Sequence, residues 1–292
     1  MDVADKDSIQ TVMVVGSGSM GRGIILSFAM AGFNTIVLTR DPSHLTDLPQ
    51  GATAHQELPE KSPDLIIEAI PEKMKLKEAL LKRLEQTYGD TPILASNTSS
   101  LPLDKMADGL KNPGRFIGIH YMHPAESLPM VEVIRVSQTS DRTLSQVKAA
   151  LKKTGKESIV LKKPIIGFLI NRLQHALLHE AYYLIEEEIV EAKDIDNFAK
   201  WMFGPRMCVT GLIEQKDISG LDTHALAQQG IVPHLHLSRK PSRVVQDKYE
   251  RGELGVKTGR GFYDWRSCDV TAHKIHAEHK LQRLLQLLKD DI

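Results

Sequence analysis

Cysteine is scarce in this sequence, and its scarcity excludes two classes of protein. The 292 residues contain only two cysteines, Cys208 and Cys268. Two isolated thiols cannot form the disulfide framework of a small secreted domain, and they cannot supply a zinc site with several cysteine ligands. We therefore expect a protein of a reducing compartment, and we place it in the cytoplasm.

The sequence also lacks net charge. Lys plus Arg and Asp plus Glu both number 37, so the formal net charge is zero. A neutral chain has no long-range field to attract nucleic acid or an anionic membrane. No apolar run is long enough to cross a bilayer, and residues 1–10 carry acids instead of a signal or transit pattern. The expected partners are therefore small molecules and other protein subunits, with no nucleic acid and no membrane.

The N-terminal part of the chain contains a strand, a glycine turn and a helix. The β-branched run Thr11–Val15 leads into glycines, and a helix-compatible pattern covers residues 22–31. Further strands are predicted at 35–38, 64–70, 93–96, 116–121 and 130–136, and a helix at 74–84. Strands that alternate with helices predict a parallel sheet with helices on both faces, which is a doubly wound α/β domain of the Rossmann type.

The pattern changes after Lys163. From Phe168 to Glu188, apolar residues recur at steps of three and four, which predicts a long amphipathic helix. Residues 194–202 and 271–288 also have helical patterns. We therefore predict two domains, a dinucleotide-binding domain over residues 1–163 and an all-helical domain over residues 164–292.

The glycine turn has the spacing of a dinucleotide site. Gly16 permits a tight turn, Gly18 leaves room for a pyrophosphate, and Gly21 lets the helix pack closely on the strand. Ser19 and Met20 lie within this turn and are also expected at the cofactor, and the free N–H groups of the following helix favour an anion. The alternative is a glycine turn that binds nothing, but its position between a strand and a helix favours binding.

Selectivity between NAD and NADP depends on the end of the second strand. An acid usually stands there and accepts hydrogen bonds from the ribose hydroxyls, whereas this chain has Thr39 followed by Arg40. A guanidinium beside a hydroxyl suits a 2′-phosphate, which favours NADP over NAD. Asp41 could instead support NAD, and Arg40 could simply be solvated. We predict NAD or NADP, with a modest preference for NADP.

Several motifs occur in an order and spacing that cover almost the whole chain. In the first half they are GSGSMGRG at 16–23, IIEAIPEKMKLK at 66–77, SNTSSL at 96–101, GIHYMHP at 118–124 and VEVI at 131–134. In the second half they are GFLINRL at 167–173, GLDT at 220–223 and GVKTGRGFYDW at 255–265. Together they resemble the 3-hydroxyacyl-CoA dehydrogenase family of fatty acid metabolism. The resemblance implies an oxidoreductase that forms a homodimer through its helical domain.

The resemblance implies that His120 is a general base and Glu132 its partner. Both residues fall at the ends of consecutive predicted strands that a short loop joins, so they can face each other. Oxidation of a secondary alcohol requires removal of the hydroxyl proton, and histidine side chains titrate near the working pH. A carboxylate would orient the imidazole and stabilise its cation. Without the resemblance, a core histidine and a surface glutamate would be the simpler interpretation.

Other site residues also follow from the resemblance. Ser99 and Asn171 would hold the substrate oxygen. Alternatively, Ser99 or Ser100 begins the helix that runs towards Leu110. The residues expected around the cofactor are Glu72, Lys77, Asn97, His123 and Lys257.

The chain departs from the family pattern at two places. His123 replaces an asparagine beside the nicotinamide, which adds a second titratable group to the site. Relatives also carry a helical hairpin after the second strand that clamps coenzyme A, whereas residues 40–64 are few and rich in proline. The clamp is therefore expected to be missing, which puts the acyl-CoA substrate in doubt while leaving the redox chemistry intact.

The leading hypothesis is reversible, NAD(P)-dependent oxidation of an L-3-hydroxyacyl group. A second hypothesis is a dehydrogenase or reductase of a small free 3-hydroxy acid or ketone. A third is a non-catalytic dinucleotide-binding protein that acts as a structural element or a sensor. The histidines at 273, 276 and 279 and at 234 and 236 lack an obvious carboxylate or cysteine shell, so we expect no metal site.

Overall fold

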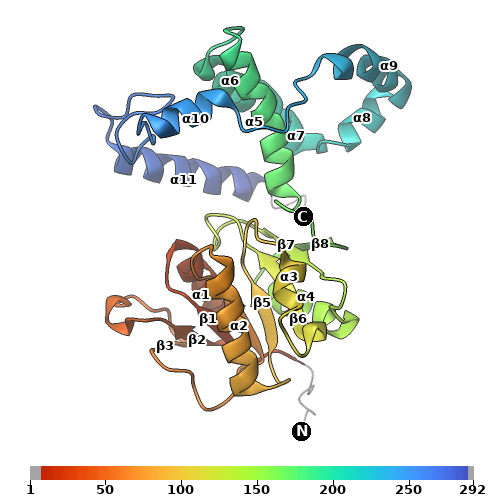
Figure 1. The fold of residues 1–292 in the computed structure, drawn as a ribbon. Helices are drawn as coiled ribbons and strands as arrows, with labels where there is room; N and C mark the ends of the chain where they lie inside the picture. Colours follow the sequence, from red (N-terminus) through yellow and green to blue (C-terminus); the bar gives the residue numbers. More distant parts are fainter. Residues whose placement is uncertain (1–7, 289–292) are drawn as a thin grey trace. The chain divides into compact units, whose positions relative to one another are not determined.

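The computed structural model describes residues 8–288 of the chain. It divides into two compact units, Met1–Arg172 and Leu173–Ile292 (Figure 1). The predicted boundary after residue 163 precedes this division. Residues 164–172 stay with the first unit because Phe168 is buried in its core and the next two backbone N–H groups bond to Glu132.

The first unit is built on an eight-stranded sheet in the order β3-β2-β1-β4-β5-β6-β7-β8. The strands are β1 Thr11–Val15, β2 Asn34–Leu38, β3 Ala52–His55, β4 Leu65–Glu68, β5 Ile93–Ser96, β6 Phe116–His120, β7 Met130–Ile134 and β8 Glu157–Leu161. All neighbours are parallel except β6 and β7. The predicted doubly wound, mainly parallel sheet is confirmed. The antiparallel direction of β7 was not predicted, and it follows from the short loop that joins β6 to β7.

Helices cover both faces of this sheet. They are α1 Ser19–Met30, α2 Met74–Tyr88, α3 Leu103–Ala107 and α4 Asp141–Lys153, with short 3-10 turns η1 Pro42–His44 and η2 Pro113–Arg115. Successive residues of β1 belong to different cores: Val12 and Val14 pack with α1 and α4, whereas Met13 and Val15 pack with α2 and α3. Because both faces are covered, the central strands are continuous apolar runs.

Three elements of the first unit were not predicted. β3 lies in the proline-rich segment, and β8 extends the sheet at its other edge. The third element, α4, follows its N-cap Ser140, whose hydroxyl accepts from the Thr143 N–H at 3.1 Å. The four residues of β3 are too few to show a clear alternation. Residues 40–64, the segment where the sequence predicted no helical clamp, contain η1 and β3 and no α-helix.

The second unit is helical, as predicted. After α5 Ile170–Glu186, which begins in the first unit, it contains α6 Ala192–Phe198, the π-helix η3 Ala199–Phe203, α7 Gly204–Thr210, α8 Glu214–Ser219, α9 Leu221–Ile231, the 3-10 turn η4 Val232–His234, α10 Arg243–Glu250 and α11 Val270–Leu287. Among residues 173–288 no side chain is buried in the single chain. No helix of the described part is both long and apolar enough to span a membrane.

Candidate active site

The glycine turn between β1 and α1 has the shape that a dinucleotide requires. Gly16 has a φ of +111°, and a Cβ there would lie 2.8 Å from the carbonyl oxygen of Ala69. A Cβ on Gly21 would lie 2.1 Å from the Gly16 oxygen, so the helix and the turn are in close contact. A Cβ on Gly18 would meet nothing within 4 Å, which leaves this position open to a ligand. The residues present therefore fit a pyrophosphate at the N-terminus of α1.

The end of β2 has little that would favour a 2′-phosphate. The Thr39 hydroxyl lies 2.9 Å from that of Ser17, so it is already hydrogen-bonded within the turn. Arg40 is exposed. The Asp41 carboxylate accepts from Ser43 and lies 2.9 Å from His44, so it caps η1 and is not free for a ribose.

A buried ion pair lies beside the turn. One of its two residues, Glu68, was not predicted from the sequence. The Lys77 ammonium donates to both oxygens of Glu68 at 2.8 Å and lies 3.3 Å from Glu72. Lys77 and Glu68 are 1% and 0% exposed. Lys77 was expected at the cofactor, but its ammonium is paired within the protein. The signal for Glu68 was present in the sequence: an acid inside the apolar run IIEAI needs a buried partner.

Glu72 holds the loop that contains Ser99. Its carboxylate accepts from the Thr98 hydroxyl at 2.5 Å and from the N–H groups of Ser99 and Ser100 at 2.9 and 3.1 Å. Burial opposes ionisation of Glu72, but these hydrogen bonds and the nearby Lys77 outweigh it and lower the pKa of Glu72. The carboxylate therefore stays ionised and keeps the loop in place.

The structure brings Asn171 to Ser99. The Asn171 amide lies 3.4 Å from the Ser99 carbonyl oxygen, and Ser99 is exposed. The alternative of helix capping by Ser99 or Ser100 was wrong, because α3 begins at Leu103 and its N-cap is Pro102. Asn97 has a different contact: its side-chain oxygen accepts from the Tyr121 N–H at 2.9 Å and so joins the ends of β5 and β6.

His120 and Glu132 are direct cross-strand partners in the antiparallel pair β6–β7. They are 2% and 4% exposed, and Nδ1 of His120 lies 2.6 Å from Oε2 of Glu132. An ionised carboxylate can only accept, so the imidazole nitrogen is the donor. This contact leaves Nε2 as the nitrogen that can take up a proton from another molecule.

The second oxygen of Glu132 is held by the start of α5. Oε1 accepts from the N–H groups of Leu169 at 2.8 Å and Ile170 at 3.0 Å. Burial opposes ionisation of Glu132, but the bonds from His120 and from these two N–H groups outweigh it and lower the pKa of Glu132. The carboxylate is therefore an anion with both oxygens occupied, which suits it to stabilise an imidazolium.

Of the remaining predicted residues, Ser19 and Met20 begin α1, whereas His123 and Lys257 lie in loops. His123 is exposed and precedes Pro124 through a cis peptide bond. Lys257 is exposed in the second unit, in a loop that the bridge between Gly255 and Arg260 closes.

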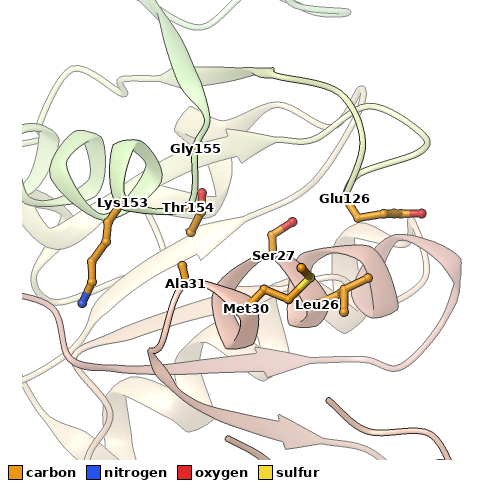
Figure 2. A pocket seen from close by; sticks show the side chains of 8 residues that line it. All are labelled: Leu26, Ser27, Met30, Ala31, Glu126, Lys153, Thr154 and Gly155. Atoms are coloured by element: carbon orange, nitrogen blue, oxygen red, sulfur yellow. The ribbon is translucent and has the colours of Figure 1, made fainter. Parts of the chain in front are cut away.

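A pocket of about 300 Å³ elsewhere in the first unit is unrelated to these residues (Figure 2). It is lined by Leu26, Ser27, Met30, Ala31, Glu126, Lys153, Thr154 and Gly155. Except for Glu126, these residues belong to the C-terminal ends of α1 and α4 or directly follow them, away from the glycine turn at the start of α1. None of the predicted site residues lines it, so we do not assign it to the candidate site.

A glycine turn on a Rossmann sheet, together with a buried acid–histidine pair, defines a dinucleotide-dependent oxidoreductase. The family model for the NAD binding domain of 3-hydroxyacyl-CoA dehydrogenase matches residues 11–63 and 50–164, and the model for the C-terminal domain of the same enzyme matches residues 167–265. The chain therefore belongs to the 3-hydroxyacyl-CoA dehydrogenase family. The two models meet close to the domain boundary predicted from the sequence.

Individual relatives are similar over nearly their whole length. A probable 3-hydroxybutyryl-CoA dehydrogenase of Bacillus subtilis is 31% identical, with 88% of this chain and 98% of the relative covered. The 5-formyl-3-hydroxy-2-methylpyridine 4-carboxylate 5-dehydrogenase of Mesorhizobium japonicum is 24% identical, with 96% and 99% covered.

Among solved structures, the crystal structure of an enzyme of that second name matches with a TM-score of 0.90 at 24% identity and covers 96% of this chain and 99% of its own. A 3-hydroxyacyl-CoA dehydrogenase of Archaeoglobus fulgidus matches with a TM-score of 0.71 at 30% identity and covers 95% of this chain and 99% of its own. Both solved structures have the fold of this chain, but their names give different substrates.

Proposed function

We propose that this protein catalyses reversible hydride transfer between NAD and a hydroxyl-bearing carbon, with His120 as the general base. The observation that carries the proposal is the buried contact of 2.6 Å between His120 and Glu132, in which Glu132 is held from its other side by backbone N–H groups. Such a pair keeps one imidazole nitrogen in the donor state and the other ready to accept a proton.

The chain's own groups have separate tasks in this reaction. The nicotinamide of NAD, when bound, supplies the hydride acceptor. Nε2 of His120 removes the hydroxyl proton during oxidation and returns it during reduction. Glu132 stabilises the imidazolium that forms, and Ser99 and Asn171 hold the substrate oxygen. The Ser99 N–H donates to the Glu72 carboxylate, which fixes the loop that carries Ser99 and supports this assignment.

We infer that NAD, rather than NADP, is the cofactor. The matching family domain is described as NAD binding, and the structural relative with the TM-score of 0.90 is described as NAD⁺ dependent. The preference for NADP that the sequence suggested has no support from either. Its physical basis is also weak, since the Thr39 hydroxyl is bonded to Ser17 and Arg40 extends into solvent.

For the substrate, we propose a small hydroxy acid or related alcohol that is not carried on coenzyme A. Residues 40–64 form η1 and β3 instead of a helical clamp. The relative that acts on a pyridine carboxylate, according to its name, covers nearly all of this chain. The L-3-hydroxyacyl-CoA group remains the second candidate, because the 3-hydroxybutyryl-CoA relatives reach 31 and 32% identity.

A comparison of substrates separates these two candidates. We would measure kcat/KM for acetoacetyl-CoA, its pantetheine analogue and free 3-oxo acids, each with NADH and with NADPH. Binding energy from the nucleotide end of coenzyme A can assist the reaction only where the protein contacts it. We expect coenzyme A to improve kcat/KM by less than about tenfold over the pantetheine analogue. An advantage of several orders of magnitude would favour the acyl-CoA candidate.

We further propose a homodimer that forms through the helical unit, in the cytoplasm. The support for the dimer is the exposure of large apolar side chains on this unit, among them Trp201 at 77% and Val209 at 81%. A single chain that exposes such side chains needs a partner surface. The support for the compartment is that both cysteines are free thiols on the surface of the described chain.

A further inference from the structure

The turn before α5 has an unusual backbone at a residue with a large side chain. Gly167 has a φ of +81° and Phe168 a φ of +49°, so two consecutive residues are in the left-handed region. For a bulky residue this conformation is strained, and it persists only when the surroundings impose it. Phe168 is also 2% exposed, so the strain lies in the core and not at a mobile surface.

This turn contacts both members of the acid–histidine pair. The Phe168 ring packs against the His120 imidazole, with 5.3 Å between the ring centroids and an angle of 57° between the planes. The next two residues, Leu169 and Ile170, donate their N–H groups to Oε1 of Glu132. The chain reversal at Gly167 and Phe168 therefore places a ring on the base and two donors on its carboxylate within four consecutive residues.

Core packing alone does not explain the arrangement. A leucine or a phenylalanine in an ordinary helical or extended conformation could fill the same apolar cluster without a positive φ. The positive φ has another consequence here: it turns the first N–H groups of α5 towards the carboxylate. The positive end of that helix then lies at Glu132, which favours its anionic form.

We propose that the left-handed turn Gly167–Phe168 is a positioning device for the catalytic pair. It fixes the Glu132 carboxylate through two backbone donors and limits rotation of the His120 ring through the Phe168 side chain. Neither residue of the turn reacts. The proposal rests on the proposed function of His120, and it adds that the backbone of this turn, and not only the two side chains, sets the geometry of proton transfer.

The test compares two glycines with similar backbone conformations. Gly155 has a φ of +74°, lies between α4 and β8, and has open space at its Cβ position. Gly167 would place its Cβ no closer than 3.4 Å to other atoms. Alanine therefore meets the same kind of backbone strain at both sites with little steric conflict, and Gly155→Ala is the matched control for Gly167→Ala.

The readouts are the melting temperature, kcat, the dissociation constant of NAD, and the downfield proton NMR signal of the Nδ1–H bonded to Glu132. We expect both variants to lose similar thermal stability. Gly167→Ala should also lower kcat by about tenfold or more and weaken or abolish the downfield signal, with NAD affinity unchanged. Gly155→Ala should keep both kcat and the signal.

A second pair of variants separates the ring from the backbone. Phe168→Gly removes the ring and relieves the positive φ, whereas Phe168→Leu keeps apolar volume without the flat ring face. We expect both to lower kcat, with Phe168→Leu the more stable of the two. If activity simply follows stability across all four variants, or if Gly167→Ala keeps kcat and the signal, the turn is only structural. His120→Gln decides the proposed function independently, because its activity does not depend on the role of the turn.

Discussion

The two units of this protein bury apolar residues in opposite ways. The first unit has two continuous cores, one on each face of the sheet, and its central strands are almost completely buried. In the second unit, none of residues 173–288 is buried in the single chain. A unit with its own core can fold by itself, and the proposed dimer would supply a partner surface to the unit without one. The chemistry that can be assigned from internal contacts lies in the unit with the core.

The sequence explains this difference. Strands such as Thr11–Val15 are apolar at every position after the first, so only a location between two layers of helices satisfies them. The helices of the second unit carry apolar stripes together with many charged and polar residues, as in Ile170–Glu186. A stripe of this kind covers only one side, and its partner need not belong to the same chain.

The largest expected effect tests whether the chemistry lies in the first unit. His120→Gln should lower turnover by roughly 10²-fold or more, because the proton acceptor is lost, while NAD affinity changes little. Glu132→Gln should have a smaller effect. His276→Gln, at an exposed position of α11 in the second unit, is the control and should leave kcat unchanged. Near-normal turnover of the His120 variant would contradict the assignment of the base.

The second prediction tests whether the second unit needs a partner. Trp201→Glu places a charge at a residue that is 77% exposed, and it should weaken dimerisation by about 100-fold if a second copy covers this side chain. Light scattering and analytical ultracentrifugation would measure the change. Met30→Glu is the matched control, because Met30 is 78% exposed in the first unit and should not affect the dimer. If Trp201→Glu and Met30→Glu weakened dimerisation equally, the second unit would not be the one that needs a partner surface.

A third, smaller effect concerns the choice between NAD and NADP at the end of β2. Thr39→Asp combined with Arg40→Ala should raise the preference for NAD over NADP by about tenfold, or ~1.4 kcal/mol. An acid accepts from the free ribose hydroxyl and repels a 2′-phosphate. Dissociation constants of the two cofactors, measured for both proteins, check this. An unchanged ratio would mean that the end of β2 does not contact the ribose.

The smallest effect is on the acid stability of the first unit. The pKa of Glu132 is lowered from its ordinary value of 4.5, because hydrogen bonds outweigh burial. Its contribution to stability is therefore present above about 4.5 and is lost as the pH falls through the lowered pKa. The free energy of unfolding, measured by urea titration, should fall less between about pH 6 and about pH 3 for Glu132→Gln than for the wild type. The same acid sensitivity in both proteins would show that Glu132 is not stabilised as an anion.

Much of the fold could be predicted, because its elements have clear local signals. The strand–turn–helix of residues 11–31 combines a β-branched run, four glycines and a helical pattern, and it appears as β1 and α1. β3 and β8 were missed, since short edge strands have weak patterns. The direction of β7 was missed because direction depends on how the chain returns to the sheet.

The candidate site was predictable in part. Motif order and spacing singled out His120 and Glu132, and the structure brings them to 2.6 Å of each other. Phe168 could not be found in this way, because nothing in the residue type indicates a positive φ or a contact with a histidine 48 positions earlier in the chain. Lys77 was expected at the cofactor, and only the structure shows that its ammonium is bonded to Glu68.

The sequence by itself determined the class of this protein: local patterns select strands and helices, and the glycine spacing selects a dinucleotide turn, because each depends on neighbours along the chain. Tertiary structure alone decided which atoms meet. The antiparallel pairing of β6 with β7 placed the imidazole opposite the carboxylate, and the left-handed turn at Gly167 and Phe168 aimed the first N–H groups of α5 at that carboxylate. These contacts join residues that are distant in the sequence, and no local propensity encodes them.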